Sequence, residues 1–216
     1  MKIALLGATG FVGTALLTEA LSRGHQVTAI VRDPAKLTTQ NDLLTVVTGD
    51  VDQPAQLAQQ LAGHDLVLSA YNAGWGHADL YNAFLAGSNA IEQATEQAGV
   101  PRLLVIGGGG SLFIDGHQVV DSPEFPAEYK AGATAARDYF NLVQQNPQLD
   151  WTVFSPALEM HQGIDTGRTG QYRLGTDSPV FSAEGRSVLS VEDLAVAVLD
   201  EVEKHQFSRQ RFTAAY

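Results

Sequence analysis

The feature that most constrains this fold is the segment Leu5-Leu6-Gly7-Ala8-Thr9-Gly10-Phe11-Val12-Gly13, which spaces its glycines as G-x-x-G-x-x-G. It follows a short apolar run and opens an amphipathic segment, so it joins a strand to a helix. Gly7 permits a tight turn, Gly10 lets the backbone approach a pyrophosphate, and Gly13 lets the helix pack closely on the strand. Free N–H groups at the helix start attract the anion. The segment therefore predicts a dinucleotide site formed by Gly7, Ala8, Thr9, Gly10, Phe11, Val12 and Gly13, although a plain strand-to-helix turn also uses glycine.

Short apolar runs alternate with longer amphipathic segments along most of the chain. The expected strands are Lys2–Leu6, Gln26–Val31, Leu44–Thr48, Leu66–Ser69, Arg102–Ile106, Trp151–Phe154 and a last one near Arg211–Ala214. Continuous apolar strands separated by helices form a parallel sheet that is covered on both faces. The pattern predicts an α/β fold, a doubly wound parallel sheet of the Rossmann type in three α/β/α layers.

Length and composition favour one domain spanning residues 1–216. The chain has 216 residues, and 44% of them are hydrophobic, which suffices for one large core. After Ser155 the periodic pattern stops and glycines become frequent. We expect residues 156–190 to form loops and small strands over the strand ends, where they would cover a substrate.

Charge and composition exclude several classes of function. The formal net charge is −11 and the sequence pI is about 4.8, whereas a nucleic-acid partner requires a basic surface. The sequence contains no cysteine, and no histidines and carboxylates have metal-ligand spacing, so neither disulfides nor a metal site are expected. No apolar run is long enough for a membrane span. We expect a cytoplasmic protein, either a monomer or a homodimer.

The second expected strand ends at a residue that indicates which nicotinamide cofactor binds. An NAD site usually places a carboxylate there for the ribose hydroxyls, whereas an arginine can pair with a 2′-phosphate. Arg32 occupies this place and Lys36 follows it, which favours NADPH. Asp33 is only one residue later and could serve NADH, so NADH stays an alternative.

Two further strand ends carry predicted cofactor contacts. Asp50 and Val51 follow the third strand, where the dinucleotide-binding proteins that the glycine turn resembles place an acid beside the adenine, although Asp50 could equally cap the next helix. Ala70, Tyr71 and Asn72 follow the fourth strand, and these residues are expected to pass the cofactor ribose.

Several motifs together resemble one branch of a known superfamily. The GATG turn resembles the atypical short-chain dehydrogenases/reductases. With V-R-D, R-L-L-V-I-G-G-G-G-S-L, W-T-x-x-S-P and S-V-E-D-L-A-x-A-V-L-D, the chain is similar to the NADH-flavin reductases, which are related to biliverdin-IXβ reductase and the NmrA-like proteins. The resemblance spans nearly all of the chain. It implies hydride transfer from a nicotinamide cofactor to a flavin or a similar flat conjugated acceptor, with the flavin as substrate and not as a tightly bound cofactor.

The resemblance also implies where catalysis would occur. Gly107 and Gly108 would lie beside the nicotinamide, and Ser111 stands where the superfamily carries its catalytic serine, although a solvated turn serine is the alternative. Tyr129 lies at the start of a helix, but Ala133 replaces the lysine that lowers the tyrosine's pKa in the standard site. Tyr129 is therefore expected to line the pocket and to be a weak acid.

Reduction of a flavin does not need the tuned proton donor that reduction of a ketone needs, because the charge that arrives with hydride is delocalised over the flavin ring. The expected acceptor pocket consists of Trp75, Phe113, Pro156, Met160 and Tyr172, with Tyr129 beside them. Two other functions stay open at this point. A non-catalytic redox sensor of the NmrA type would use the same glycine turn, and a nucleotide-sugar epimerase or dehydratase would need the missing lysine.

Overall fold

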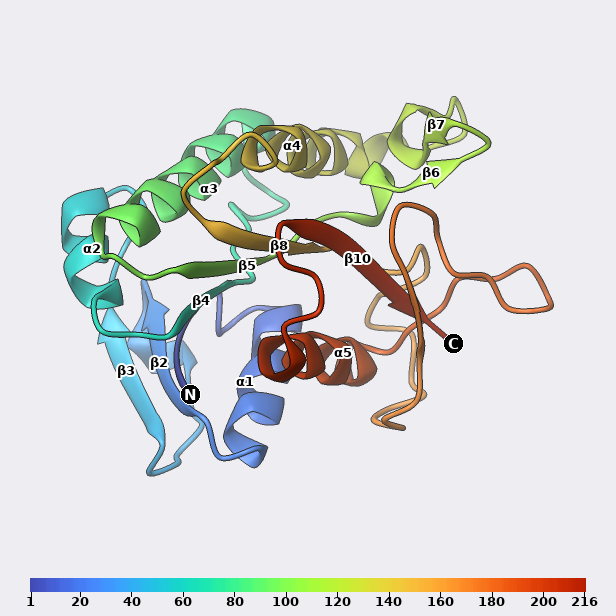
Figure 1. Cartoon of the computed structure of the whole chain (residues 1–216). Helices are drawn as coiled ribbons and strands as arrows, with labels where there is room; N and C mark the ends of the chain where they lie inside the picture. The colour runs from blue at the N-terminus through green and yellow to red at the C-terminus, as the bar shows by residue number, and fades with distance from the viewer.

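In a computed structural model, which describes residues 1–216, the chain folds around one eight-stranded sheet (Figure 1). The strand order is β3-β2-β1-β4-β5-β8-β10-β9. The strands are β1 (Lys2–Leu6), β2 (Gln26–Val31), β3 (Leu44–Thr48), β4 (Leu66–Ser69), β5 (Arg102–Ile106), β8 (Asp150–Phe154), β9 (Arg173–Gly175) and β10 (Gln210–Ala215). Every neighbouring pair is parallel except β10 and β9, which are antiparallel. The predicted doubly wound sheet is confirmed, with one short antiparallel strand added at its edge.

Helices cover both faces of the sheet. Figure 1 shows α1 (Phe11–Ser22) and α5 (Val191–Lys204) below the strands, with α2 (Pro54–Leu61), α3 (Leu80–Gln97) and α4 (Ala127–Val143) above them. A hairpin of β6 (Phe113–Ile114) and β7 (His117–Gln118) projects beyond α4. The three α/β/α layers predicted from the sequence are therefore confirmed. None of these helices combines the length and the apolar character needed to span a membrane.

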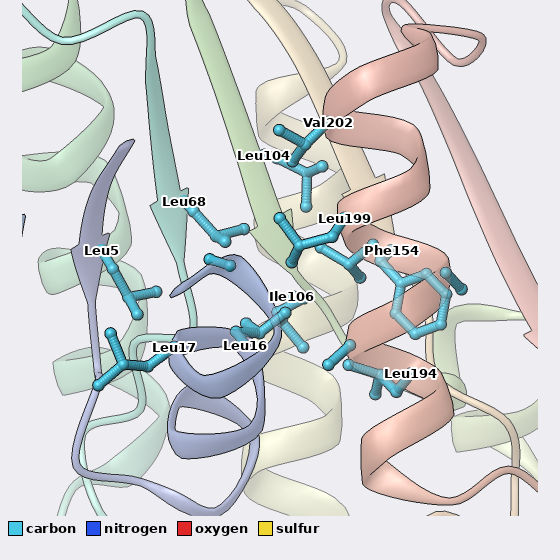
Figure 2. Close-up of a cluster of buried hydrophobic side chains, with 14 of the residues drawn as sticks. Leu5, Leu16, Leu17, Leu68, Leu104, Ile106, Phe154, Leu194, Leu199 and Val202 are labelled. Atoms are coloured by element: carbon cyan, nitrogen blue, oxygen red, sulfur yellow. The ribbon is translucent and has the colours of Figure 1, made fainter. Parts of the chain in front are cut away.

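The core consists of two apolar layers, one on each face of the sheet. Along β5, Leu104 and Ile106 face α1 and α5, while Leu103 and Val105 face the other three helices. Figure 2 shows the first layer, in which side chains of the strands meet those of α1 and α5. Burying one such leucine contributes about 1.5–3 kcal/mol, so both layers hold the helices firmly to the sheet.

The strand order reverses between β1 and β4, because the chain leaves β1 for β2 on one side and returns to β4 on the other. At such a switch point the connections after neighbouring strands turn to opposite faces and leave a crevice at the carboxyl ends. The glycine turn after β1 and the segment after β4 meet at this crevice. The fold thereby places the predicted dinucleotide turn where a ligand can reach it.

Residues 156–190 connect β8 to α5 mostly through loops. An isolated parallel bridge joins Glu159 to Val188, and β9 then extends the sheet beside β10. Between them, the main-chain N–H groups of Thr169 and Gly170 donate to the Asp193 carboxylate at 2.9 and 2.7 Å. Much of the segment is thereby tied to α5, and its role as a substrate cover stays a prediction.

Candidate active site

The turn after β1 is closed by main-chain contacts that leave no room for side chains. Gly7 has φ +81°, and a Cβ on it would lie 2.3 Å from the carbonyl oxygen of Ala70. A Cβ on Gly13 would lie 1.9 Å from the carbonyl oxygen of Gly7, so α1 packs directly against the turn. Gly10 caps α1 without a side-chain hydrogen bond, and no acidic residue occupies the first helical turn. The first N–H groups of α1 are therefore open to an anion.

Two cations follow β2, and neither is engaged elsewhere. Arg32 and Lys36 are exposed and form no hydrogen bond or ion pair through their side chains, whereas Asp33 accepts the N–H of Ala35 at 3.1 Å. The carboxylate is thus used within its own turn. A 2′-phosphate would find two free cations here, and the second oxygen of the Asp33 carboxylate is free for a ribose hydroxyl.

The acid after β3 has a local role of its own. Asp50 accepts the N–H of Asp52 at 3.1 Å, and α2 is capped by Gln53, so the alternative in which Asp50 caps that helix is wrong. Asp50 and Val51 are both partly exposed. Their predicted contact with an adenine stays a prediction.

The segment after β4 presents main chain and not side chains to the glycine turn. Tyr71 lies close to Gly7 through its main-chain nitrogen, but its hydroxyl donates to the carbonyl of Ala83 at 3.2 Å and its ring stacks on Phe84. Burial, with the nearby negative charge of Asp52, raises the pKa of Tyr71. Any contact of Tyr71 with a cofactor would therefore be made by its backbone.

Asn72 is likewise occupied, because its Oδ1 accepts the N–H of Gly74 at 2.7 Å. This bond shapes the loop that leads to Trp75.

The glycine loop after β5 lies between β8 and α4. The N–H of Gly107 donates to the carbonyl of Phe154 at 2.8 Å, which continues the pairing of β5 with β8. A Cβ on Gly109 would lie 2.7 Å from the carbonyl oxygen of Pro156, and a Cβ on Gly108 would lie 3.1 Å from the Cβ of Ala136. Gly108 and Gly109 are thus needed because α4 approaches the loop on one side and the main chain after β8 approaches it on the other.

Ser111 ends this loop with its side chain turned inward. The residue is 1% exposed, and its hydroxyl donates to the carbonyl of Gly108 at 2.7 Å and lies 3.2 Å from the hydroxyl of Ser155. In this arrangement the hydroxyl braces the loop. The alternative of a solvated turn serine is therefore wrong, and the catalytic role of Ser111 stays a prediction.

A buried arginine holds the same loop from behind. Arg211 donates through Nη1 to the Ser111 carbonyl at 2.8 Å, pairs with Asp177, and lies over the rings of Phe140 and Phe113. Its side chain is only 2% exposed. Arg211 lies in an expected strand, but its role was not predicted; an arginine within an apolar run is the signal that could have indicated it.

The start of α4 contains no amine that could assist Tyr129. Ala133 packs against the glycine loop, because a Cβ on Gly110 would lie 3.2 Å from the Cβ of Ala133. Lys130, the neighbour of Tyr129, donates instead to the carbonyl of Val120 and lies over the ring of Phe125. Neither Ala133 nor Lys130 therefore places an amine beside the Tyr129 hydroxyl.

The predicted acceptor pocket separates into residues near the strand ends and residues elsewhere. Trp75 packs edge-on against Tyr129 with ring centroids 5.6 Å apart, and Pro156 adjoins the glycine loop. Met160 is partly buried and packs against the core layer beneath α1 and α5, not against Trp75 and Tyr129.

Two more of the predicted pocket residues are held by partners distant in sequence. The Tyr172 hydroxyl donates to Asp200 of α5 at 2.8 Å, and burial together with this bond raises the pKa of Tyr172. Phe113 lies beside Arg211, and its N–H donates to the carbonyl of Asp177 at 2.8 Å. The place of both residues in the acceptor pocket stays a prediction.

Comparisons with known proteins agree with this geometry. The sequence model described as NAD(P)H-binding matches residues 7–204. The protein YwnB of Bacillus subtilis is 37% identical over 216 residues, covering 99% of this chain and 97% of its own. A crystal structure from Bacteroides thetaiotaomicron, provisionally named an epimerase, is 40% identical with a TM-score of 0.92, covering 100% of this chain and 96% of its own. A Streptococcus pneumoniae structure, provisionally named an NADH-flavin reductase, is 33% identical with a TM-score of 0.85, covering 100% and 99%.

Proposed function

Because the chain belongs to the NAD(P)H-binding family, we propose that it is a reductase that passes hydride from NADPH, or alternatively NADH, to a flavin, a quinone or another flat conjugated acceptor. Family membership supports the nicotinamide cofactor. The similarity to a protein provisionally named an NADH-flavin reductase supports the class of acceptor.

The observation that carries the choice of acceptor is the alanine face of α4. Ala133 and Ala136 lie against the glycine loop, where the standard site of the superfamily places a lysine near the nicotinamide. Reduction of a ketone needs an acid tuned to donate a proton as hydride arrives. An acceptor that delocalises the new charge needs only geometry and exclusion of water. The alanine face fits the second requirement.

A bound NADPH would supply hydride, which carries two electrons and one proton, and the reduced acceptor would take its second proton from water. The turn at Gly7–Gly13 would hold the pyrophosphate at the start of α1. Arg32 and Lys36 would hold a 2′-phosphate, which is why we favour NADPH. The glycine loop, braced by Ser111, would support the nicotinamide.

The same observations distinguish this proposal from an epimerase. Epimerisation through a keto intermediate needs the tyrosine and lysine pair, and Lys130 is directed to the Val120 carbonyl. A redox sensor that binds the dinucleotide without turnover shares every feature described so far. The test must therefore separate turnover from binding.

The purified protein should be incubated with NADPH or NADH and with FMN, FAD, riboflavin or a quinone, while absorbance of the reduced nicotinamide is followed. We expect oxidation of NADPH that depends on the acceptor. Tight binding of NADPH without oxidation by any acceptor would favour the sensor and refute the reductase.

Replacement of Tyr129 by Phe tests the absence of a tuned acid. We expect a loss of turnover below about tenfold, equivalent to about 1.4 kcal/mol of barrier, because the ring is kept and only the hydroxyl is removed. A loss of about a thousandfold would identify the hydroxyl as a true proton donor.

A further inference from the structure

We propose that Trp75 and Tyr129 form a stacking platform for the planar ring of the acceptor, and that Gly132 sets the position of this platform. The inference rests on the proposed function, because it names the surface that would receive the acceptor. Both residues were expected in the acceptor pocket, and the structure adds their edge-on contact and its dependence on Gly132.

The two rings are exposed to a degree unusual for aromatic side chains. Trp75 is 60% exposed and Tyr129 is 49% exposed, although both rings are large and apolar. They meet at an interplanar angle of 82°, so the edge of one ring contacts the face of the other. This contact fixes their relative orientation, so a planar ligand would stack on the face of one ring and meet the other ring nearly at a right angle.

The polar atoms of the pair are also free. Neither the Trp75 indole N–H nor the Tyr129 hydroxyl has a hydrogen-bond partner within the protein, in contrast to Tyr71, Tyr81 and Tyr139. A ligand that stacks here could therefore also be bound through its rim. The fitting chemistry is a planar conjugated ring with carbonyl groups at its edge, as in an isoalloxazine or a quinone.

Gly132 determines where the indole lies. A Cβ on Gly132 would lie 2.8 Å from Cζ3 and 3.2 Å from Cη2 of Trp75, so the indole rests on the bare backbone of α4. Any side chain at this position would push the ring away. The glycine is thus needed for the contact, and alanine would otherwise favour the helix.

The same stretch of α4 links the platform to the predicted nicotinamide site. Gly132 contacts Trp75, while the next residue, Ala133, contacts the glycine loop at Gly110. Tyr129, Gly132, Ala133 and Ala136 follow the i, i+3, i+4, i+7 spacing of one helix face. The platform therefore lies beside the glycine loop, which would support the nicotinamide, and a ring stacked on it would be near the hydride.

The experiment uses the whole protein saturated with NADP⁺, so that no turnover occurs, and riboflavin as the probe. Riboflavin lacks a phosphate, so its binding reports on the ring. Binding is followed by the quenching of flavin fluorescence. We expect Trp75→Ala to weaken riboflavin binding by about tenfold or more, because stacking of one base on an aromatic side chain contributes on this scale.

Matched controls separate the platform from general effects. Trp151 is 5% exposed within β8, and Trp151→Phe should leave riboflavin affinity unchanged. Gly132→Ala should weaken riboflavin binding without changing NADP⁺ affinity. Gly76→Ala lies in the same loop as Trp75, and a Cβ there meets nothing within 4 Å, so this variant should behave as the wild type.

The outcomes distinguish this inference from the proposed function. If the wild type reduces riboflavin while Trp75→Ala and Gly132→Ala keep the same KM for it, the platform is wrong and the reductase stands. If the wild type oxidises no cofactor but Trp75→Ala still loses riboflavin affinity, the platform stands as a ligand site and the reductase is wrong. A rise in the KM for riboflavin with an unchanged KM for NADPH supports both.

Discussion

Replacement of Arg211 by methionine is the perturbation that most directly tests the support of the glycine loop. Arg211 is buried, and its Nη1 donates to the carbonyl of Ser111 at 2.8 Å. Methionine keeps most of the aliphatic volume between Phe113 and Phe140 but removes every donor. The Ser111 carbonyl would then lose a partner that carries charge.

The magnitude follows from these contacts. A hydrogen bond to a charged group contributes about 1.5–3 kcal/mol. The pair with Asp177 adds less than about 1 kcal/mol, because that carboxylate is 71% exposed. The buried Nε of Arg211 has no partner, so removing it recovers part of its desolvation cost. We expect a net loss of about 2 kcal/mol, or roughly 4–8 °C in Tm for a chain of this size.

Urea and thermal unfolding of Arg211→Met would measure this loss, with Asp177→Asn as the matched control. The control should cost less than about 1 kcal/mol, because it weakens only the exposed pair. In the same variants we expect kcat for acceptor reduction to fall more than NADPH affinity in Arg211→Met, because the pyrophosphate turn follows β1 and only the nicotinamide would meet the glycine loop after β5. Equal stability of Arg211→Met and wild type, or an equal cost in both variants, would refute the reasoning.

Three further predictions concern other parts of the molecule. Arg32→Ala should weaken NADPH binding by about tenfold or more and leave NADH binding unchanged in equilibrium titrations, and an equal effect on both would contradict the 2′-phosphate assignment. Gly13→Ala should lower the free energy of unfolding in urea by about 3 kcal/mol or more, because the new Cβ would lie 1.9 Å from the Gly7 carbonyl oxygen. An unchanged free energy of unfolding would mean that α1 is free to shift. The hydrogen bond from Arg168 lowers the pKa of the Glu19 carboxyl below its ordinary value of 4.5. The stability that ionised Glu19 contributes should therefore be fully present above pH 4.5 and be lost as the pH falls through the lowered pKa. Urea unfolding on both sides of pH 4.5 should show a shallower loss for Glu19→Gln, and identical pH profiles would exclude this pair as a cause.

The sequence by itself determined the features that depend on local backbone geometry and on the spacing of apolar residues along the chain. The spacing of Gly7, Gly10 and Gly13 specifies one kind of turn, because only glycine tolerates its backbone angles and close contacts. The apolar runs specified the strands and hence the layered sheet. A serine directly before an acidic first turn specifies a helix cap, and the Ser190 hydroxyl accepts the N–H of Asp193 at 3.1 Å. Each of these signals is contained within a few neighbouring residues.

Only the tertiary structure decided which distant residues meet. Arg211 and Ser111 are 100 positions apart, and they touch because β10 is placed beside β8. Tyr172 and Phe113 are held by a carboxylate on α5 and an arginine on β10, both distant in sequence. The physical reason is that a loop aromatic is placed by its partners, and those partners are chosen by strand order and helix packing, which no local pattern records.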